Sequence, residues 1–460
     1  MNQARGAGIS LRLAEFVART PDALVPASAL QAAARVVLDA TGVMRAASAL
    51  SPEALPFIAQ AVEGGSGPAS VLGTTHRVRA PLAALANGAM AHALDYEDAF
   101  DAAPVHPNAS LVPAVLALAQ AHGPVNGRQL LAAIAVGCDV ACRIALCLRQ
   151  RLEDGGWYPP PILAAFGAVA GAARILRLSP RQLLDAWSML LLQNSCAGEI
   201  KYDRETVIRA VREAFPAQAA VQVSQLALGG VRGFDAPLEG RAGFFRLFAS
   251  GRYDIDTLFA DLGHRWHIEQ LSFKPWPSCR GTHAAVECAL QLRGAVDFRD
   301  IRQIRIEGCE VHRMLAEPID RKRVPQTAID AKFSLPFTVA TGLVTGRVDL
   351  DSFTAPALAH LDVLALAGLA SFDLREDFGV DRAVSGAVQV TLLDGRVLRH
   401  EVLEPRGSPA RPLAEADLVA KFVDCAGRAQ NILAPGPAGA LAERILGLAD
   451  EADAGALLAT

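Results

Sequence analysis

The chain has 460 residues, a length at which a single hydrophobic core has usually stopped growing, so we expect at least two domains. Hydrophobic residues make up 52% of the sequence and charged residues 20%, which excludes a largely disordered chain. The 44 Lys and Arg against 48 Asp and Glu give a net charge of -4, and no long basic run occurs. Nucleic acid is therefore not expected as a partner.

Three features of the sequence indicate the cellular compartment of the protein. The first 19 residues lack an uninterrupted apolar core, so we expect no secretory signal. The most apolar long segment, 130–148, contains Asp139 and Arg143, and central charges are costly in a membrane span, so we predict a buried helix and no membrane partner. The eight cysteines are scattered without a CxxC pair, which favours reduced thiols and a cytoplasmic protein.

The hydrophobic pattern divides the chain into a mainly helical part and a mixed part. Residues 1–265 show helical spacing, with many small residues that allow helices to pack closely, and predict an all-helical domain. Residues 266–412 are predicted to form a smaller α+β domain. The final stretch, 413–460, returns to helical periodicity, and we assign it to the helical domain, although the sequence alone does not decide which domain it completes.

Strand and helix signals in the second part are specific enough to place. Alternation at Val388, Val390 and Leu392 before Asp394-Gly395 predicts a β-hairpin, because both residues of an Asp-Gly pair tolerate positive φ. Residues 283–293 and 331–344 are predicted helices, which we expect to cover one face of a small, mainly antiparallel sheet.

The densest polar cluster in the helical part runs from His92 to Asp101 and is followed by His106. Asp95 lies at helical spacing from His92, so it is expected near the packed face, where a carboxylate could orient an imidazole that acts as a general base. An acidic helix end that faces solvent fits Glu97 and Asp101 well.

A second cluster, residues 273–283, lies at the junction of the two predicted domains, a preferred place for ligand sites. It contains Lys274, Arg280 and His283 on a proline-rich loop, where cations suit the binding of carboxylates. Surface lysines and arginines are more often simply solvated, so this signal is weak by itself.

Two further segments could contribute to a site. Residues 198–213 hold Lys201, Arg209 and Arg212; the two arginines are three residues apart and are expected to share a helix face that could bind two carboxylates or could simply face solvent. Tyr158 follows Trp157 on a Gly- and Pro-rich loop, where packing and catalysis are about equally good explanations.

Metal and cofactor motifs are missing from the sequence. It contains no HExxH, no Cys/His group at zinc spacing, no P-loop and no GxGxxG after a predicted strand. Cys138 and Cys142 are four apart but are better explained as core residues. We therefore predict catalysis without a metal or cofactor.

Several segments together resemble one known family. NGAMAHALDYEDAF, HPNASLVPAVLALA, PPPILAAFGAVAGAARIL, GFDAPLEGRAGFFRLF, FKPWPSCRGTHAAVECAL and AKFSLPFTVATGLV are similar in order and spacing to the MmgE/PrpD family, and the resemblance covers most of the chain. Activities in that family include 2-methylcitrate dehydratase, cis-aconitate decarboxylase and iminodisuccinate epimerase. Proton transfer at a carbon flanked by carboxylates unites them.

The resemblance implies a large all-helical domain with a smaller α+β domain, a site between them, and a homodimer. It places Asp95, His106 and Lys274 at family positions implicated around the active site. Departures are expected at four positions: Tyr158 replaces a frequent histidine, Arg209 a frequent lysine, Phe337 the tyrosine of some decarboxylases, and Ala99 a usual threonine.

These observations lead to a mechanistic hypothesis. His106, oriented by Asp95, moves the proton, and Tyr158 serves as the second acid or base. Substrate carboxylates are held by cations, which we expect to be Lys274, Arg209, Arg212, Arg280, Lys201 and, with them, His283. The predicted activity is that of a hydro-lyase (dehydratase) on a small di- or tricarboxylate; the alternatives are an epimerase, isomerase or decarboxylase of a related acid, and a non-catalytic carboxylate-binding homologue.

Overall fold

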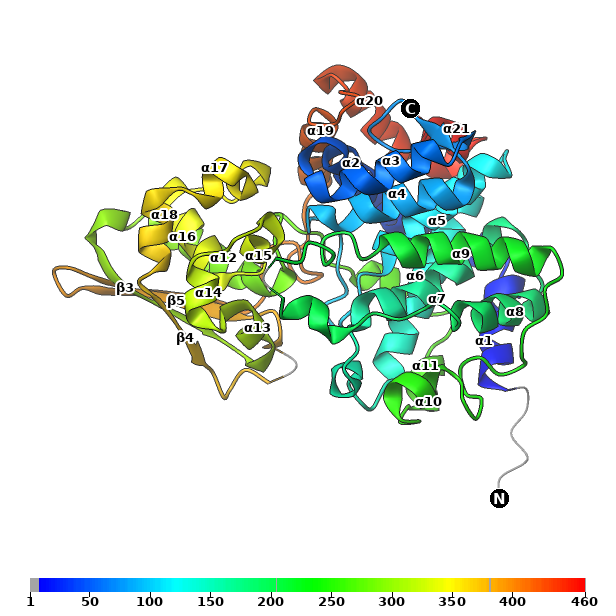
Figure 1. Ribbon diagram of the computed structural model, residues 1–460, viewed down its shortest axis with the longest axis horizontal. Coiled ribbons are helices and arrows are strands. Elements are labelled where there is room, and N and C mark those ends of the chain that lie inside the picture. Colours follow the sequence, from blue (N-terminus) through cyan, green and yellow to red (C-terminus); the bar gives the residue numbers. More distant parts are fainter. Residues whose placement is uncertain (1–7, 204, 380–381, 460) are drawn as a thin grey trace.

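The computed structural model describes residues 8–203, 205–379 and 382–459. Figure 1 shows a large helical body beside a smaller unit that contains a sheet. This architecture confirms the predicted fold class, mainly α with a smaller α+β domain. The domain boundaries proposed from the sequence stay a prediction.

The helical body is built from long helices and a few short ones. In chain order they are α1 (Ile9–Arg19), α2 (Ala27–Leu50), α3 (Leu55–Glu63), α4 (Ala80–Ala93), α5 (Pro107–Ala121), α6 (Gly127–Cys147), α7 (Pro159–Ile175), α8 (Pro180–Leu190), α9 (Ala214–Leu228), α10 (Phe244–Ala249) and α11 (Ile255–Phe259). A short antiparallel pair, β1 (Ser66–Ser70) with β2 (Arg77–Val78), interrupts them. The helical pattern of the sequence did not predict this pair.

Close packing of α6 on α7 depends on glycine. A Cβ atom at Gly167 would lie 2.4 Å from the carbonyl oxygen of Gly137, and one at Gly137 would lie 2.7 Å from the carbonyl of Gly167. The two backbones can approach this closely only because neither residue carries a side chain. Helix α6 is the one helix in the described ranges that is long and apolar enough to cross a membrane, and 94% of its most apolar window is buried inside the protein.

The smaller unit carries a sheet with the strand order β4-β3-β5-β6. Its strands are β3 (Ile301–Gly308), β4 (Ala370–Leu374), β5 (Gly386–Leu392) and β6 (Val397–Val402). Only the β3 and β4 pair is parallel. The predicted Asp-Gly hairpin joins β5 to β6, and Gly395 takes a φ of 89°, as such a turn requires.

Helices pack beside this sheet, and the last helices return to the helical body. The helices of the smaller unit are α12 (His283–Arg293), α13 (Arg313–Ala316), α14 (Ile319–Arg323), α15 (Ala328–Lys332), α16 (Leu335–Thr345), α17 (Ala355–Leu358) and α18 (Leu361–Ala367). The bounds of α12 match the prediction. The single helix predicted over 331–344 is instead α15 and α16, separated where Ser334 caps α16 ahead of Pro336.

The C-terminal helices are α19 (Glu415–Ala426), α20 (Pro435–Leu446) and α21 (Ala454–Leu457). Helix α19 packs on α2, so segments near the two ends of the chain share one layer, and Figure 1 shows the red and orange end of the chain beside the blue beginning. This return brings Lys421 of α19 close to the segment that follows α4.

Candidate active site

The polar centre of the molecule begins where α4 ends. Leu94 follows the last turn of α4, and Asp95 then takes a left-handed conformation with a φ of 49°. Aspartate is among the few non-glycine residues that occupy this region with any frequency. The turn directs the side chains of Asp95 and Glu97 into the protein, where both are 1% exposed.

Lys274 is the partner of Asp95. Its ammonium lies 2.5 Å from Asp95 Oδ1, donates to the Asp95 carbonyl at 3.1 Å, and lies 3.8 Å from Glu97 Oε2. Burial works to lower the pKa of Lys274, but the two carboxylates outweigh it and raise the pKa above its usual value. Burial likewise works to raise the pKa of Asp95, yet Lys274 and the nearby imidazoles lower it. The pair is therefore charged on both sides.

Two histidines contact Glu97. His92 Nδ1 bonds to Glu97 Oε1, and His106 Nδ1 lies 3.2 Å from the same oxygen. The prediction that Glu97 belongs to a solvent-facing helix end is wrong, because the left-handed turn at Asp95 ends the helix and points Glu97 inward. The prediction that Asp95 orients His106 is also wrong, because Glu97 and the Asp98 carbonyl occupy that place.

Of the two histidines that contact Glu97, His106 is the one with a free ring nitrogen. Its Nδ1 bonds to the Asp98 carbonyl at 3.0 Å, and its Nε2 makes no hydrogen bond to any residue that the structure describes. Burial lowers the pKa of His106 to about 3, in spite of the neighbouring Glu97. The imidazole is therefore neutral, with the proton on Nδ1 and a lone pair on Nε2, and its side chain is 17% exposed.

His92, by contrast, is committed at both nitrogens. Its Nδ1 bonds to Glu97, and its Nε2 accepts from Arg212 Nη1. Burial, followed by Arg212, lowers the pKa of His92 well below its usual value. Because neither nitrogen is free, His92 links Arg212 to Glu97 rather than acting as a base.

Arg209 and Arg212 lie together on the segment before α9, which is a series of turns rather than the predicted helix. Arg212 is bonded to Glu213 at 3.2 Å and to His92. Arg209 stacks over the ring of Phe333 at 3.5 Å and donates through Nε to the Tyr158 hydroxyl at 3.3 Å. The Nη2 group of Arg209 is buried and has no hydrogen-bond partner within the described residues.

Tyr158 directly precedes α7, its ring faces both arginines, and it is 6% exposed. Its hydroxyl accepts a hydrogen bond from Arg209, and no residue in the described ranges accepts the hydroxyl proton. The Lys201 ammonium lies 5.9 Å from the centre of the Tyr158 ring. Burial lowers the pKa of Lys201. A phenol in this arrangement can donate its proton.

Two predicted substrate-binding residues are already bonded elsewhere. Arg280 pairs with Asp101 at 3.0 Å, and Arg280 Nη1 lies 3.3 Å from His283 Nδ1. His283 Nε2 lies 3.1 Å from the Ser278 carbonyl. Asp101, expected to face solvent, instead fixes this loop through Arg280. Phe337 lies in α16 and is buried beside Phe353.

Three polar residues at the site were not assigned to it from the sequence. Glu213 is fully buried, accepts from Ser110 and pairs with Arg212; burial raises its pKa. Lys332 and Lys421 each bond to backbone carbonyls around Asp95 and Lys274. Glu213 directly precedes α9, Lys332 ends α15 and Lys421 lies within α19, positions that in a sequence also describe ordinary capping or surface charges.

His92, Asp95 and Glu97 bring three potential metal-ligand atoms within 4.8 Å of one another. Lys274 is bonded to Asp95 and Arg212 to His92, so two cations already occupy these donors. A metal ion would have to displace them and would be repelled by them. The donor set does not fit a metal.

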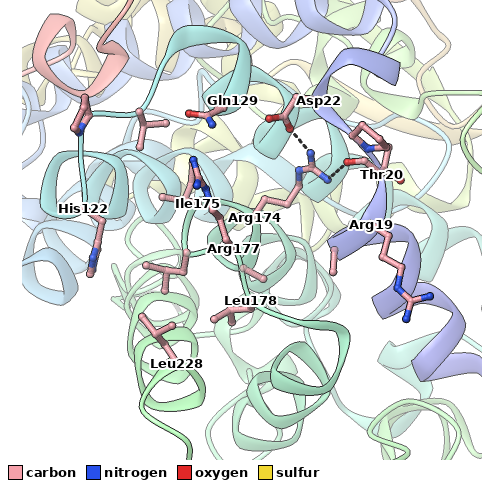
Figure 2. A pocket seen from close by; sticks show the side chains of 16 residues that line it. Arg19, Thr20, Asp22, His122, Gln129, Arg174, Ile175, Arg177, Leu178 and Leu228 are labelled. Carbon is pink, nitrogen blue, oxygen red and sulfur yellow. Dashed lines mark hydrogen bonds and ion pairs between the residues drawn. The ribbon is translucent and has the colours of Figure 1, made fainter.

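Figure 2 shows a different hollow, a cavity of about 610 Å³ where α1, α5 and α7 end. Its central Arg174 is bonded to Asp22 and to the carbonyls of Val17 and Thr20, so it completes helix ends. None of the candidate site residues lines this cavity.

The site around His106 thus combines a neutral imidazole, a phenol and several cations at the junction of a helical domain and an α+β domain. That combination is characteristic of enzymes that act on anionic substrates. The chain belongs to the MmgE/PrpD family: residues 11–256 match the MmgE/PrpD N-terminal domain and residues 276–432 the MmgE/PrpD C-terminal domain.

Curated relatives are similar over most of their length. The chain is 26% identical to the cis-aconitate decarboxylase-like protein oryM of Aspergillus oryzae over 431 residues, 87% of this chain and 86% of that protein. It is 25% identical to the cis-aconitate decarboxylase of Aspergillus terreus over 386 residues, 78% and 77% of the two chains. It is 24% identical to the human cis-aconitate decarboxylase over 351 residues, 74% and 71%. These relatives support an acid-processing enzyme of the lyase or decarboxylase type.

Proposed function

We propose that this protein is a lyase that removes a proton from a carbon next to a carboxylate of a small di- or tricarboxylate and eliminates water. The observation that carries the proposal is the geometry of His106, whose Nδ1 is fixed by the Asp98 carbonyl and whose Nε2 is free. A base for this step needs a free lone pair in a fixed orientation.

The partner groups account for the rest of the reaction. Arg209 offers a buried, unpartnered Nη2 group, which a substrate carboxylate would satisfy. Arg212 lies over the same Tyr158 ring as Arg209, and Lys274 lies against Asp95 and Glu97; their positive charge stabilises the enediolate that forms when the proton leaves. These cations need no rearrangement to do so, because protein contacts already hold them.

Tyr158 is the proposed acid. When His106 takes the proton, the electron pair forms the carbon–carbon double bond, and the carbon–oxygen bond breaks. The Tyr158 proton then moves to the departing hydroxide to give water. The phenolate that remains lies within reach of Arg209 Nε, which already donates to that oxygen, and the proton on His106 returns through water to restore both groups.

Decarboxylation is the second candidate, because the three relatives described above carry cis-aconitate decarboxylase or a decarboxylase-like activity in their names. In that reaction a carbon–carbon bond breaks, carbon dioxide leaves, and the electron pair stays on the carbon. Tyr158 would protonate that carbon, and His106 would not be needed as a base. The two candidates therefore make different demands on His106.

Proton NMR in D₂O distinguishes the candidates. The wild-type protein is incubated with citrate, 2-methylcitrate, cis-aconitate and iminodisuccinate, with His106→Asn as the matched control. We expect new vinyl signals from a hydroxy acid, lost in the control. If His106→Asn still releases carbon dioxide from cis-aconitate, the proposed elimination is wrong and the protein is a decarboxylase. Deuterium incorporation without a new product would indicate an epimerase. Binding without any reaction would contradict both lyase proposals.

A further inference from the structure

Two buried lysines lie on either side of the Asp95 and Lys274 pair. Lys332 ends α15 in the α+β domain and is 2% exposed, and Lys421 lies in α19 on the helical body and is 8% exposed. Neither belongs to the acid-base cluster itself, and the two lie far apart in the sequence.

Lys421 connects three segments of the chain. Its ammonium donates to the carbonyls of Tyr96 at 2.6 Å and Lys274 at 3.0 Å. It also pairs with Asp39 of α2 at 2.6 Å and lies 3.7 Å from the centre of the Tyr96 ring. Lys421 therefore ties the turn that carries Asp95 to the loop that carries Lys274.

Lys332 does the same from the other domain. Its ammonium donates to the carbonyls of Leu94 at 2.6 Å and Pro277 at 3.3 Å. The ring of Phe353 covers it at 4.6 Å, and no carboxylate of the described chain lies within ion-pair distance. A charged group without a carboxylate partner is costly to bury, so these two carbonyls are its main compensation.

The four carbonyls form a regular pattern. Leu94 and Tyr96 flank Asp95, which holds its left-handed conformation, and Lys274 and Pro277 belong to the opposite loop. Each lysine bonds one carbonyl of each segment. Besides these bonds, Asp95 and Lys274 contact each other directly, and Ala99 bridges to Ser272.

We propose that Lys332 and Lys421 are positioning residues, a two-lysine clamp that holds the Asp95 turn against the Lys274 loop. The clamp fixes the backbone from which Asp95, Glu97 and Asp98 contact Lys274, His92 and His106. Because Lys332 comes from the α+β domain, the clamp also makes the site depend on the contact between the two domains. Its catalytic consequence rests on the proposed function, whereas its structural role does not.

The structural role is tested by hydrogen–deuterium exchange of segments 94–100 and 271–279, followed by mass spectrometry. The variants are Lys332→Met and the pair Lys421→Met with Asp39→Asn, which avoids leaving a buried carboxylate alone. We expect exchange in both segments to become about tenfold faster, because opening them no longer breaks the lysine bonds. Should one variant fail to fold, the other decides the result.

The matched control is the pair Arg143→Met with Asp139→Asn, which removes another buried cation bonded to backbone carbonyls. Arg143 bonds to the carbonyls of Leu258, Ala260, Asp261 and Arg265. We expect this control to speed exchange only near 258–265. Clamp variants that exchange in both site segments at the wild-type rate, or a control that accelerates those segments equally, would overturn the clamp.

The catalytic consequence is read from kcat and KM separately, on an acid that the wild-type protein converts. We expect kcat of the clamp variants to fall about tenfold, with KM within threefold of wild type, since small displacements of catalytic groups lower the rate of the chemical step. Lys421→Arg, which keeps the charge, is expected to recover part of kcat. If the wild-type protein converts no acid, the proposed function fails, but the exchange experiment still decides whether the clamp exists. A clamp variant with faster exchange and a normal kcat would show that the clamp has no catalytic role.

Discussion

Two buried networks of charged residues, one around Arg143 and one around Asp95, differ in whether their polar atoms all have hydrogen-bond partners. In α6 and its surroundings, Arg143 bonds to Asp139 at 2.6 Å and donates to four backbone carbonyls, and the second Asp139 oxygen accepts from the His267 amide. Around α4, Asp95 Oδ2, Glu97 Oε2 and Arg209 Nη2 are buried, and the described residues offer them no hydrogen-bond partner.

The difference indicates what each network is for. A buried ion pair whose groups are all bonded holds neighbouring segments in place and has nothing to offer a ligand. Unsatisfied buried groups cost stability, and a protein keeps them where a ligand, water or reaction completes them. The network around Asp95 also lies where the two domains meet, whereas the Arg143 network lies within the helical body.

His106 gives the largest expected effect. His106→Asn should lower kcat by about 10²-fold to 10⁴-fold, the usual contribution of a general base, because the amide cannot accept the proton. His267→Asn is the matched control: His267 is also a buried histidine, and burial lowers its pKa to about 4, but it lies away from the candidate site and joins the Arg143 network through its backbone amide. Steady-state kinetics check this; equal losses in both variants would mean that His106 has no special role.

Lys274 is next, because its loss affects stability and activity together. Lys274→Met leaves Asp95 buried without its partner and should cost about 3–5 kcal/mol in the free energy of unfolding, measured in urea. Combining it with Asp95→Asn should restore most of the stability but not turnover. The corresponding double variant, Arg143→Met with Asp139→Asn, should keep turnover. A Lys274→Met, Asp95→Asn double variant with wild-type kcat would refute the claim that the two networks have different roles.

Tyr158 should have a smaller effect. Tyr158→Phe removes the proposed proton donor while keeping the ring that contacts Arg209 and Arg212, so we expect kcat to fall about 10²-fold with little change in the melting temperature. Trp157→Phe, on the same loop but packed on Phe248, is the control that should keep kcat. A Tyr158→Phe variant with full activity would exclude the phenol as the acid.

Asp98 should give the smallest effect, one of pH on stability. Burial raises the pKa of Asp98 to about 7 against the hydrogen bond from Asn108, so the folded protein holds a proton that the unfolded chain loses near pH 4. Its contribution to stability is therefore complete below about pH 4 and is lost as pH rises to about 7, by up to ~1.4 kcal/mol per pH unit.

Asp98→Asn cannot titrate, so the free energy of unfolding should fall less between pH 4 and 7 than in the wild-type protein. Urea unfolding at both pH values measures this. Glu97, Asp39 and Lys274 act on the same carboxyl group and are left unchanged in the variant. An identical pH dependence in the two proteins would show that Asp98 is ionised throughout.

Local signals in the sequence predicted much of the fold. The Asp-Gly turn located the β5 and β6 hairpin, and periodicity gave the bounds of α12, because both depend on neighbouring residues. The contacts of the site are long-range. Asp95 and Lys274 are 179 residues apart, and the sequence pairs Asp95 with His92 and His106 because they are close in the chain. The inward orientation of Glu97 depends on a left-handed residue that no spacing rule anticipates.

The central claim is that the unpartnered Arg209 Nη2 group and the free Nε2 of His106 mark the site of a small polycarboxylate. A crystal structure of the protein with tricarballylate, which lacks a leaving hydroxyl, tests it most directly. We predict one carboxylate on Arg209 Nη2, a second near Arg212 or Lys274, and the adjacent carbon facing His106 Nε2. Tricarballylate bound only in the cavity of Figure 2, with none at His106, would contradict the account.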